Sequence, residues 1–123
     1  MKSKIIDFYD GFEGEGEIQF IQVLDDGNKS VIRIWEGYFD DFMEKIEPTS
    51  NGWTGLAYYY NLDEGWYDDS PWKIPNVAET LSQLKQIENV EFRFPESKNV
   101  INEICILLNK AIEDNICVYI ARE

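Results

Sequence analysis

The clearest hydrophobic pattern in the chain lies in its last third. Apolar residues between Val100 and Ile112 recur with the spacing of one helix face, and Ser97 stands where it can cap the first turn. The members of this face are Val100, Ile101, Ile104, Cys105, Leu107, Leu108, Ala111 and Ile112. The pattern predicts a long helix at the centre of the core.

Two shorter helices are predicted earlier in the chain. Apolar residues fall at i, i+3, i+4 and i+7 over Phe39–Ile46, and Pro48 is expected to end this stripe. A second stripe covers Val77–Gln86. Asn76 stands before it as an N-cap residue, and Glu79 follows three residues later, which is typical of a capping box.

Strands are predicted where apolar and polar residues alternate or where β-branched residues gather. Ile18–Leu24 and Lys29–Trp35 flank the turn residues Asp25–Asn28, and this arrangement predicts a β-hairpin. Single strands are predicted at Leu56–Leu62, Val90–Phe94 and Ile116–Ala121.

The predicted order is hairpin, helix, strand, helix, strand, helix, strand. Ile5–Tyr9 is apolar but too short for its periodicity to distinguish a strand from a helix. With 123 residues the chain can bury one ordinary core. We therefore expect one α+β domain over residues 1–123, with a single mixed or mainly antiparallel sheet and about three helices packed against it.

Composition and charge narrow the possible partners. A hydrophobic content of 44% with 15% aromatic residues is too high for a disordered acidic tail. The net charge of −13 repels nucleic acid and anionic lipid, so neither is expected as a direct ligand. The sequence shows no signal peptide and no membrane-spanning run, and we expect a cytoplasmic protein. Cys105 and Cys117 are expected to be buried, reduced thiols.

Acidic and aromatic residues concentrate in the middle of the chain. Residues 36–69 hold nine acidic side chains against the single base Lys45. Residues 58–72 interleave acids with aromatic rings and contain no cation, a combination that favours binding of a positively charged partner. The candidate contacts are Asp40, Asp41 and Glu44 on the polar face of a helix, with Asp63, Glu64, Trp66, Tyr67, Asp68, Asp69 and Trp72 in a loop. The alternative is that the acids are ordinary solvated surface and that Tyr58 and Tyr60 belong to the core.

Enzyme chemistry has little support in the sequence. The chain contains no histidine, and neither cysteine has a nearby cation that would activate its thiol. A pair of carboxylates could serve glycoside hydrolysis, and Asp63, Glu64, Asp68 and Asp69 could bind calcium, but no spacing singles out either site. The glycines of Gly11–Glu17 resemble a phosphate loop, although the interleaved glutamates oppose a phosphate, so a flexible acidic loop is expected. We expect no catalytic residue, no metal and no cofactor.

In size, acidity and aromatic content, the chain resembles the small bacterial immunity proteins that neutralise toxin domains delivered by neighbouring cells, including those of contact-dependent growth inhibition. The segment Glu91–Arg122 is also similar to the end of the barstar family of ribonuclease inhibitors, although no residue matches their inhibitory helix. The resemblance implies a one-to-one complex with a basic toxin domain, most simply a nuclease whose cationic cleft is occluded. The alternatives are an acidic nucleic-acid mimic that inhibits a nucleic-acid-binding protein, and a small carboxylate-dependent hydrolase.

Overall fold

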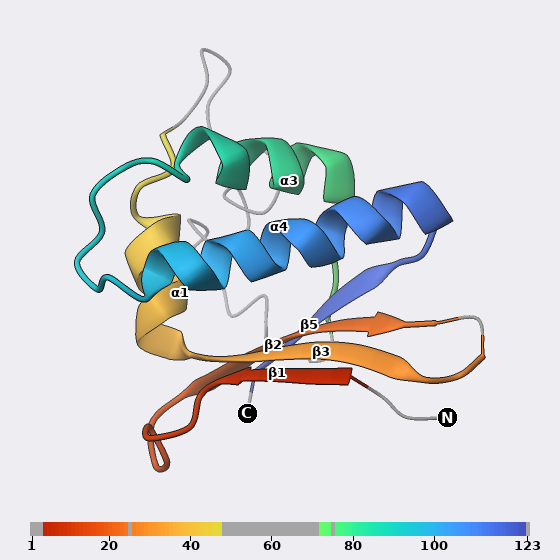
Figure 1. Cartoon of the computed structure of the whole chain (residues 1–123), viewed down its shortest axis with the longest axis horizontal. Coiled ribbons are helices and arrows are strands. Elements are labelled where there is room, and N and C mark those ends of the chain that lie inside the picture. The colour runs from red at the N-terminus through yellow and green to blue at the C-terminus, as the bar shows by residue number, and fades with distance from the viewer. Residues whose placement is uncertain (1–3, 25, 48–71, 75, 123) are drawn as a thin grey trace.

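The computed structural model describes residues 4–24, 26–47, 72–74 and 76–122. Within these residues five strands form one sheet in the order β1-β3-β2-β5-β4 (Figure 1). The strands are β1 (Lys4–Phe8), β2 (Glu17–Val23), β3 (Lys29–Trp35), β4 (Trp72–Lys73) and β5 (Val118–Arg122). β1 runs parallel to β3, and the other neighbouring strands are antiparallel. The sheet is mixed, and the predicted α+β class is confirmed.

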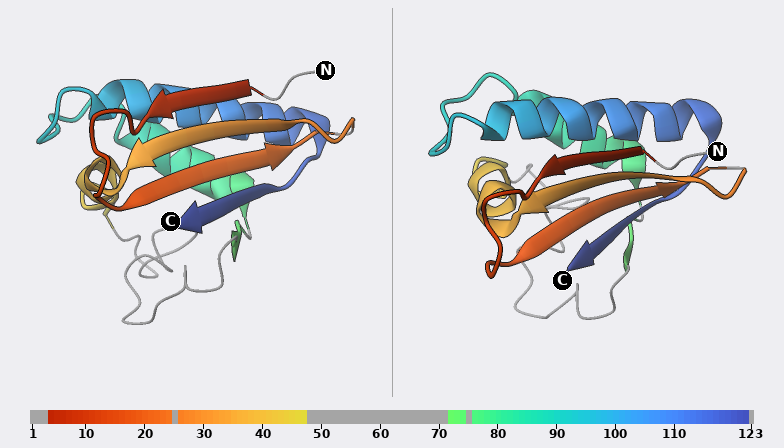
Figure 2. Two further views of the ribbon diagram at one scale, coloured as in Figure 1. Left: turned by 90° about the horizontal axis from the view of Figure 1, so that it is seen from below. Right: turned by 60° about the horizontal axis from the view of Figure 1, so that its bottom comes forward.

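The three helices of the described residues lie on one face of the sheet. They are α1 (Glu36–Met43), α3 (Val77–Gln86) and α4 (Ser97–Asp114). Figure 2 shows α4 lying along the sheet, with α3 beside α4 and α1 at one end. The Asn76 side chain accepts a hydrogen bond from the Glu79 amide at 3.0 Å, which confirms the predicted cap of α3.

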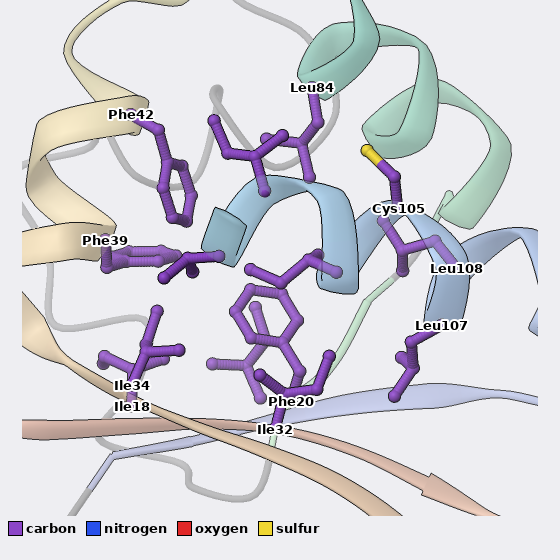
Figure 3. Close-up of a cluster of buried hydrophobic side chains, with 14 of the residues drawn as sticks. Ile18, Phe20, Ile32, Ile34, Phe39, Phe42, Leu84, Cys105, Leu107 and Leu108 are labelled. Carbon is purple, nitrogen blue, oxygen red and sulfur yellow. The ribbon is translucent and has the colours of Figure 1, made fainter. Parts of the chain in front are cut away.

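The core lies between β2, β3 and β5 on one side and the helices on the other (Figure 3). Because side chains alternate along a strand, the register that pairs Ile18 with Ile34 and Phe20 with Ile32 turns all four toward the helices. The predicted face of α4 is buried from Val100 to Ala111, whereas Ile112 is 43% exposed because it lies outside this stripe. Removing a fully buried residue of this size costs about 2–5 kcal/mol, so these residues hold the sheet and helices together.

The hairpin forms as predicted, and α1 is shifted from its expected position. In the hairpin turn Gly27 adopts a φ of 85°, and its amide donates to the Leu24 carbonyl at 2.9 Å. α1 begins at Glu36, directly after β3, and ends at Met43. The helix therefore ends before Pro48, which lies outside the described residues together with the predicted strand Leu56–Leu62.

The predicted strand Val90–Phe94 is wrong, because this segment is an irregular loop. The amides of Arg93 and Phe94 donate to the Asp41 carboxylate at 3.0 and 2.9 Å, so these donors do not join a sheet. The predicted capping by Ser97 is also wrong. Ser97 is the first residue of α4, and its hydroxyl donates to Asp41 Oδ2 at 2.7 Å.

The two cysteines differ in their surroundings. Cys105 is buried between α4 and α3 (Figure 3), and this burial raises the pKa of its thiol to about 11. Cys117 is exposed, so the expectation of a buried thiol is wrong there. It directly precedes β5, in which Val118 and Ile120 are the residues that point into the core. Both thiols are free, as expected for a chain without a disulfide framework.

Candidate functional site

Three segments that are distant in the sequence meet at one end of the domain. They are the loop between β1 and β2, helix α1, and the loop between α3 and α4, all on the left of Figure 1. The Glu36 amide donates to the Gly16 carbonyl at 2.9 Å, which joins the first segment to the start of α1. Asp41 joins α1 to the third segment through the hydrogen bonds to Arg93 and Phe94.

Four aromatic rings gather where these segments meet, and we call them the aromatic cluster: Phe12, Trp35, Tyr38 and Phe94. Phe12 stacks on Trp35 with ring centroids 4.5 Å apart and planes 5° apart. Phe94 meets Trp35 edge to face at 5.0 Å, and Tyr38 meets the other three rings edge to face at 5.4 to 6.0 Å. Tyr38 is buried, while Phe12, Trp35 and Phe94 remain half-buried. The cluster is therefore a rigid platform with ring surface still available for contact.

The loop that carries Phe12 is built from hydrogen-bonded turns. The Phe12 amide donates to the Tyr9 carbonyl at 3.0 Å, and the Glu15 amide donates to the Phe12 carbonyl at 2.9 Å. The Tyr9 hydroxyl donates to the Glu15 carbonyl at 2.6 Å. Gly11 and Gly14 have φ of 97° and 95°, a region that other residues rarely adopt. The glycines thus serve to fold the loop against Trp35.

Arg33 fixes both ends of the same loop. Its guanidinium donates to both carboxylate oxygens of Glu17, at 2.8 and 3.2 Å, and to Asp7 at 3.2 Å. Arg33 lies between the helix-facing residues Ile32 and Ile34 of β3, so its side chain is on the sheet face opposite the helices. Asp7 is its register partner on β1, so these charge-assisted bonds lie on that same face. The bond from Arg33 is the main cause of a lowered pKa at Glu17.

We expect Glu17→Gln to lower the free energy of unfolding by about 1–2 kcal/mol at neutral pH. A lowered folded-state pKa means that the carboxylate stabilises the fold above its unfolded pKa, and that this contribution is lost as pH falls through the folded value. The difference between Glu17→Gln and the wild type should therefore shrink at pH 3. Urea unfolding at both pH values measures it, with exposed Glu113→Gln as the control. An equal difference at both pH values would refute the role of the charge.

Asp41 holds the third segment in place. It is 2% exposed and accepts three hydrogen bonds, from the amides of Arg93 and Phe94 and from the Ser97 hydroxyl. Burial by itself raises the pKa of Asp41, but the three hydrogen bonds and nearby Lys45 outweigh it, and the pKa is lowered. The prediction that Asp41 lies on a solvated helix face is therefore wrong. Its carboxylate positions Phe94 in the aromatic cluster.

Carboxylates surround the aromatic cluster, and we call the whole surface the acidic end. The segments 10–17, 36–47 and 88–96 together carry twelve acidic and two basic side chains. Arg93 pairs with Glu44 at 3.4 Å, and Arg122 from β5 pairs with Glu36 at 3.2 Å. Exposed pairs of this kind contribute at most about 1 kcal/mol each. The surface is strongly negative even with these pairs, as the acidic side chains exposed on it include Asp10, Glu13, Glu15, Glu44, Glu47, Glu91 and Glu96.

The other predicted contacts fall in different places. Asp40 is half-buried on α1 and Glu44 is exposed at its C-cap, so both belong to the acidic end. Trp72 lies in β4, where its half-buried ring packs against the hydrophobic core opposite Ile120, and this corrects its assignment to a loop. Six predicted contacts lie outside the described residues and stay predictions: Asp63, Glu64, Trp66, Tyr67, Asp68 and Asp69.

The sequence analysis missed the aromatic cluster. Phe12 and Trp35 are each followed directly by a glutamate, and Phe94 lies between Glu91 and Glu96. This is the same alternation of acids and rings that singled out residues 58–72. The three short segments are too far apart in the sequence to suggest one surface, and the strand predicted at Val90–Phe94 assigned Phe94 to a sheet.

A metal site is not indicated among the described residues at this end. They contain no group of three or more cysteine, aspartate or glutamate side chains arranged to hold a metal ion. Burial is the main cause of a raised pKa at the Tyr38 hydroxyl, with a further contribution from the negative charge of Glu96. Among the helices of the described residues, none is long and apolar enough to cross a membrane.

Comparison with protein-family models, with curated proteins and with solved structures found no significant match.

Proposed function

We propose that the chain is an immunity protein, which binds a cognate basic toxin domain one to one in the cytoplasm and neutralises it without catalysis. The observation that carries the proposal is the acidic end, where a partly exposed aromatic cluster is surrounded by an excess of carboxylates. Fixed rings supply contact area with little loss of side-chain freedom, and carboxylates attract a cationic surface from a distance.

A nuclease is the toxin that suits this surface best. Its substrate cleft must be cationic to hold phosphates, so the cleft attracts the same carboxylates that nucleic acid would repel. Glu13, Glu15 and Glu91 would occupy phosphate positions, while Phe12 and Trp35 exclude water at the centre of the contact. Occlusion of the cleft would deny the nucleic acid entry.

The predicted contacts that lie outside the described residues extend the same proposal. Asp63, Glu64, Asp68 and Asp69 would add charge to the interface, and Trp66 and Tyr67 would add anchors. Replacing Asp68 and Asp69 with lysine is then expected to weaken protection at little cost in stability. Full protection by that variant would confine the interface to the acidic end.

The experiment is co-expression with a toxin domain. A basic domain at the end of a large secreted protein encoded beside the gene is the partner to test. We expect cells that express this domain to grow only when the chain is present, and the two proteins to copurify as a one-to-one complex. Failure to protect cells or to copurify would refute the proposal. Copurification with a host nucleic-acid-binding protein instead would favour the nucleic-acid mimic.

A further inference from the structure

A cavity of about 180 Å³ is lined by residues of α4, β1, β2 and β3, away from the acidic end. It opens between α4 and the sheet edge that β1 and β3 form. Half of its lining is aliphatic, from Ile6, Leu24, Ile32, Ile106 and Leu107, and the polar half includes Ser30. Ile106 is 62% exposed, so this side is open to solvent. An apolar cavity of about 150 Å³ can hold benzene, so the space suits a ring-sized molecule.

The cavity also contains a buried amide. Gln22 lines it and is 1% exposed, and its Nε2 has no hydrogen-bond partner among the described residues. Gln22 follows Phe20 by two residues and so lies on the helix-facing side of β2, where an apolar side chain would be expected. A buried donor without a partner destabilises the folded state, and few such groups occur in native proteins. A ligand with an acceptor would satisfy this donor.

The charges around the opening indicate that the ligand is neutral. Lys4, Lys110 and Glu103 line the cavity, and Asp114 pairs with Lys110 at 3.2 Å. The two cations and two carboxylates balance. Five of the nine residues that line the cavity with Gln22 are aliphatic, and both lysines are exposed, so a carboxylate buried beside Gln22 would be costly. An uncharged oxygen has no such penalty.

We propose that this cavity binds a small uncharged carbonyl compound with a compact apolar body, and that the carbonyl oxygen accepts a hydrogen bond from Gln22. Cyclic ketones, lactones and amides of about six to nine non-hydrogen atoms match this description. The last torsion of a glutamine side chain has a broad energy profile, so the amide can turn toward the ligand. The site lies apart from the acidic end and does not depend on the proposed function.

Cyclohexanone and methylenecyclohexane form a matched pair of probes, because they share one shape and differ in the carbonyl oxygen. In an NMR titration we expect cyclohexanone to shift the Gln22 side-chain amide and the methyl signals of Ile106 and Leu107, with a dissociation constant of about 1–10 mM. Methylenecyclohexane should bind about tenfold more weakly. Equal binding of the two probes, or no saturable shift with cyclohexanone, would overturn the proposal.

Gln22→Leu separates ligand recognition from folding. The variant keeps the size of the side chain and removes the buried amide, so we expect its melting temperature to rise while its affinity for cyclohexanone falls about tenfold. Gln86→Leu, on the exposed surface of α3, is the control and should leave the affinity unchanged. If Gln22→Leu binds cyclohexanone as tightly as the wild type, the assignment of Gln22 is wrong.

Discussion

Asp41→Ala is expected to lower the free energy of unfolding by about 3 kcal/mol, which is a large part of the stability of a domain of this size. The substitution leaves the partly buried amides of Arg93 and Phe94 and the buried Ser97 hydroxyl without their acceptor. Each such group retains its desolvation cost and loses the bond that offset it. Urea unfolding at pH 7 measures the loss.

Asp41→Asn and Glu44→Ala are the controls for this prediction. Asparagine keeps one carbonyl oxygen as an acceptor, so its loss should be intermediate. Glu44 is exposed, and its ion pair is with an exposed arginine side chain, so its removal should cost less than about 1 kcal/mol. A loss for Asp41→Ala no larger than that for Glu44→Ala would show that Asp41 does not hold the loop between α3 and α4.

The pH dependence of Asp41→Ala provides a second readout. Because the pKa of Asp41 is lowered in the folded protein, its carboxylate stabilises the fold above the unfolded pKa. This contribution is lost as pH falls through the folded-state value. The wild type should therefore lose more stability between pH 5 and pH 2 than Asp41→Ala does. Parallel pH profiles would contradict the assignment of this charge.

Reversal of charge at the acidic end should slow association with a basic partner. Glu15→Lys and Glu91→Lys each change an exposed carboxylate beside the aromatic cluster, one in each loop. We expect the double variant to associate with the basic toxin domain at least about tenfold more slowly at low salt, because steering depends on the local field. The defect should diminish at high salt, where the field is screened.

Glu113→Lys is the matched control for each single variant. It makes the same change of net charge at an exposed position near the end of α4, away from the acidic end. Stopped-flow association at about 20 and 500 mM salt measures the wild type, the two single variants, the double variant and the control. A slowing by Glu113→Lys equal to that of Glu15→Lys or Glu91→Lys would mean that net charge matters and that the acidic end does not.

Much of the fold could be predicted because its signals are local. The hairpin turn depends on Gly27 and its neighbours, and the start of α3 depends on Asn76 and Glu79. β1 could not be predicted because five apolar and polar residues do not reveal a parallel partner such as β3. The segment Val90–Phe94 alternates as a strand does, but a carboxylate more than fifty residues away takes two of its amides.

The candidate site, like the fold, depends on long-range contacts that its local sequence does not reveal. The acidic and aromatic surface predicted over residues 58–72 stays a prediction, because residues 58–71 lie outside the described residues. The acids and rings that the structure brings together at the acidic end are a different set. The identity of the rings depended on tertiary contacts, because Phe12, Trp35 and Phe94 come from three segments that are far apart in the sequence. Asp41 looked like its neighbours on the polar face of a helix, and only the position of the loop between α3 and α4 buries it.

The most direct test of the acidic end is an NMR map of the chain bound to its basic partner domain. We expect the largest amide shifts in residues 10–17, 36–47 and 88–96, with Trp35 as the most perturbed side chain. Shifts confined to residues 58–72, or to the sheet face around Arg33, would contradict the assignment of the interface to the acidic end.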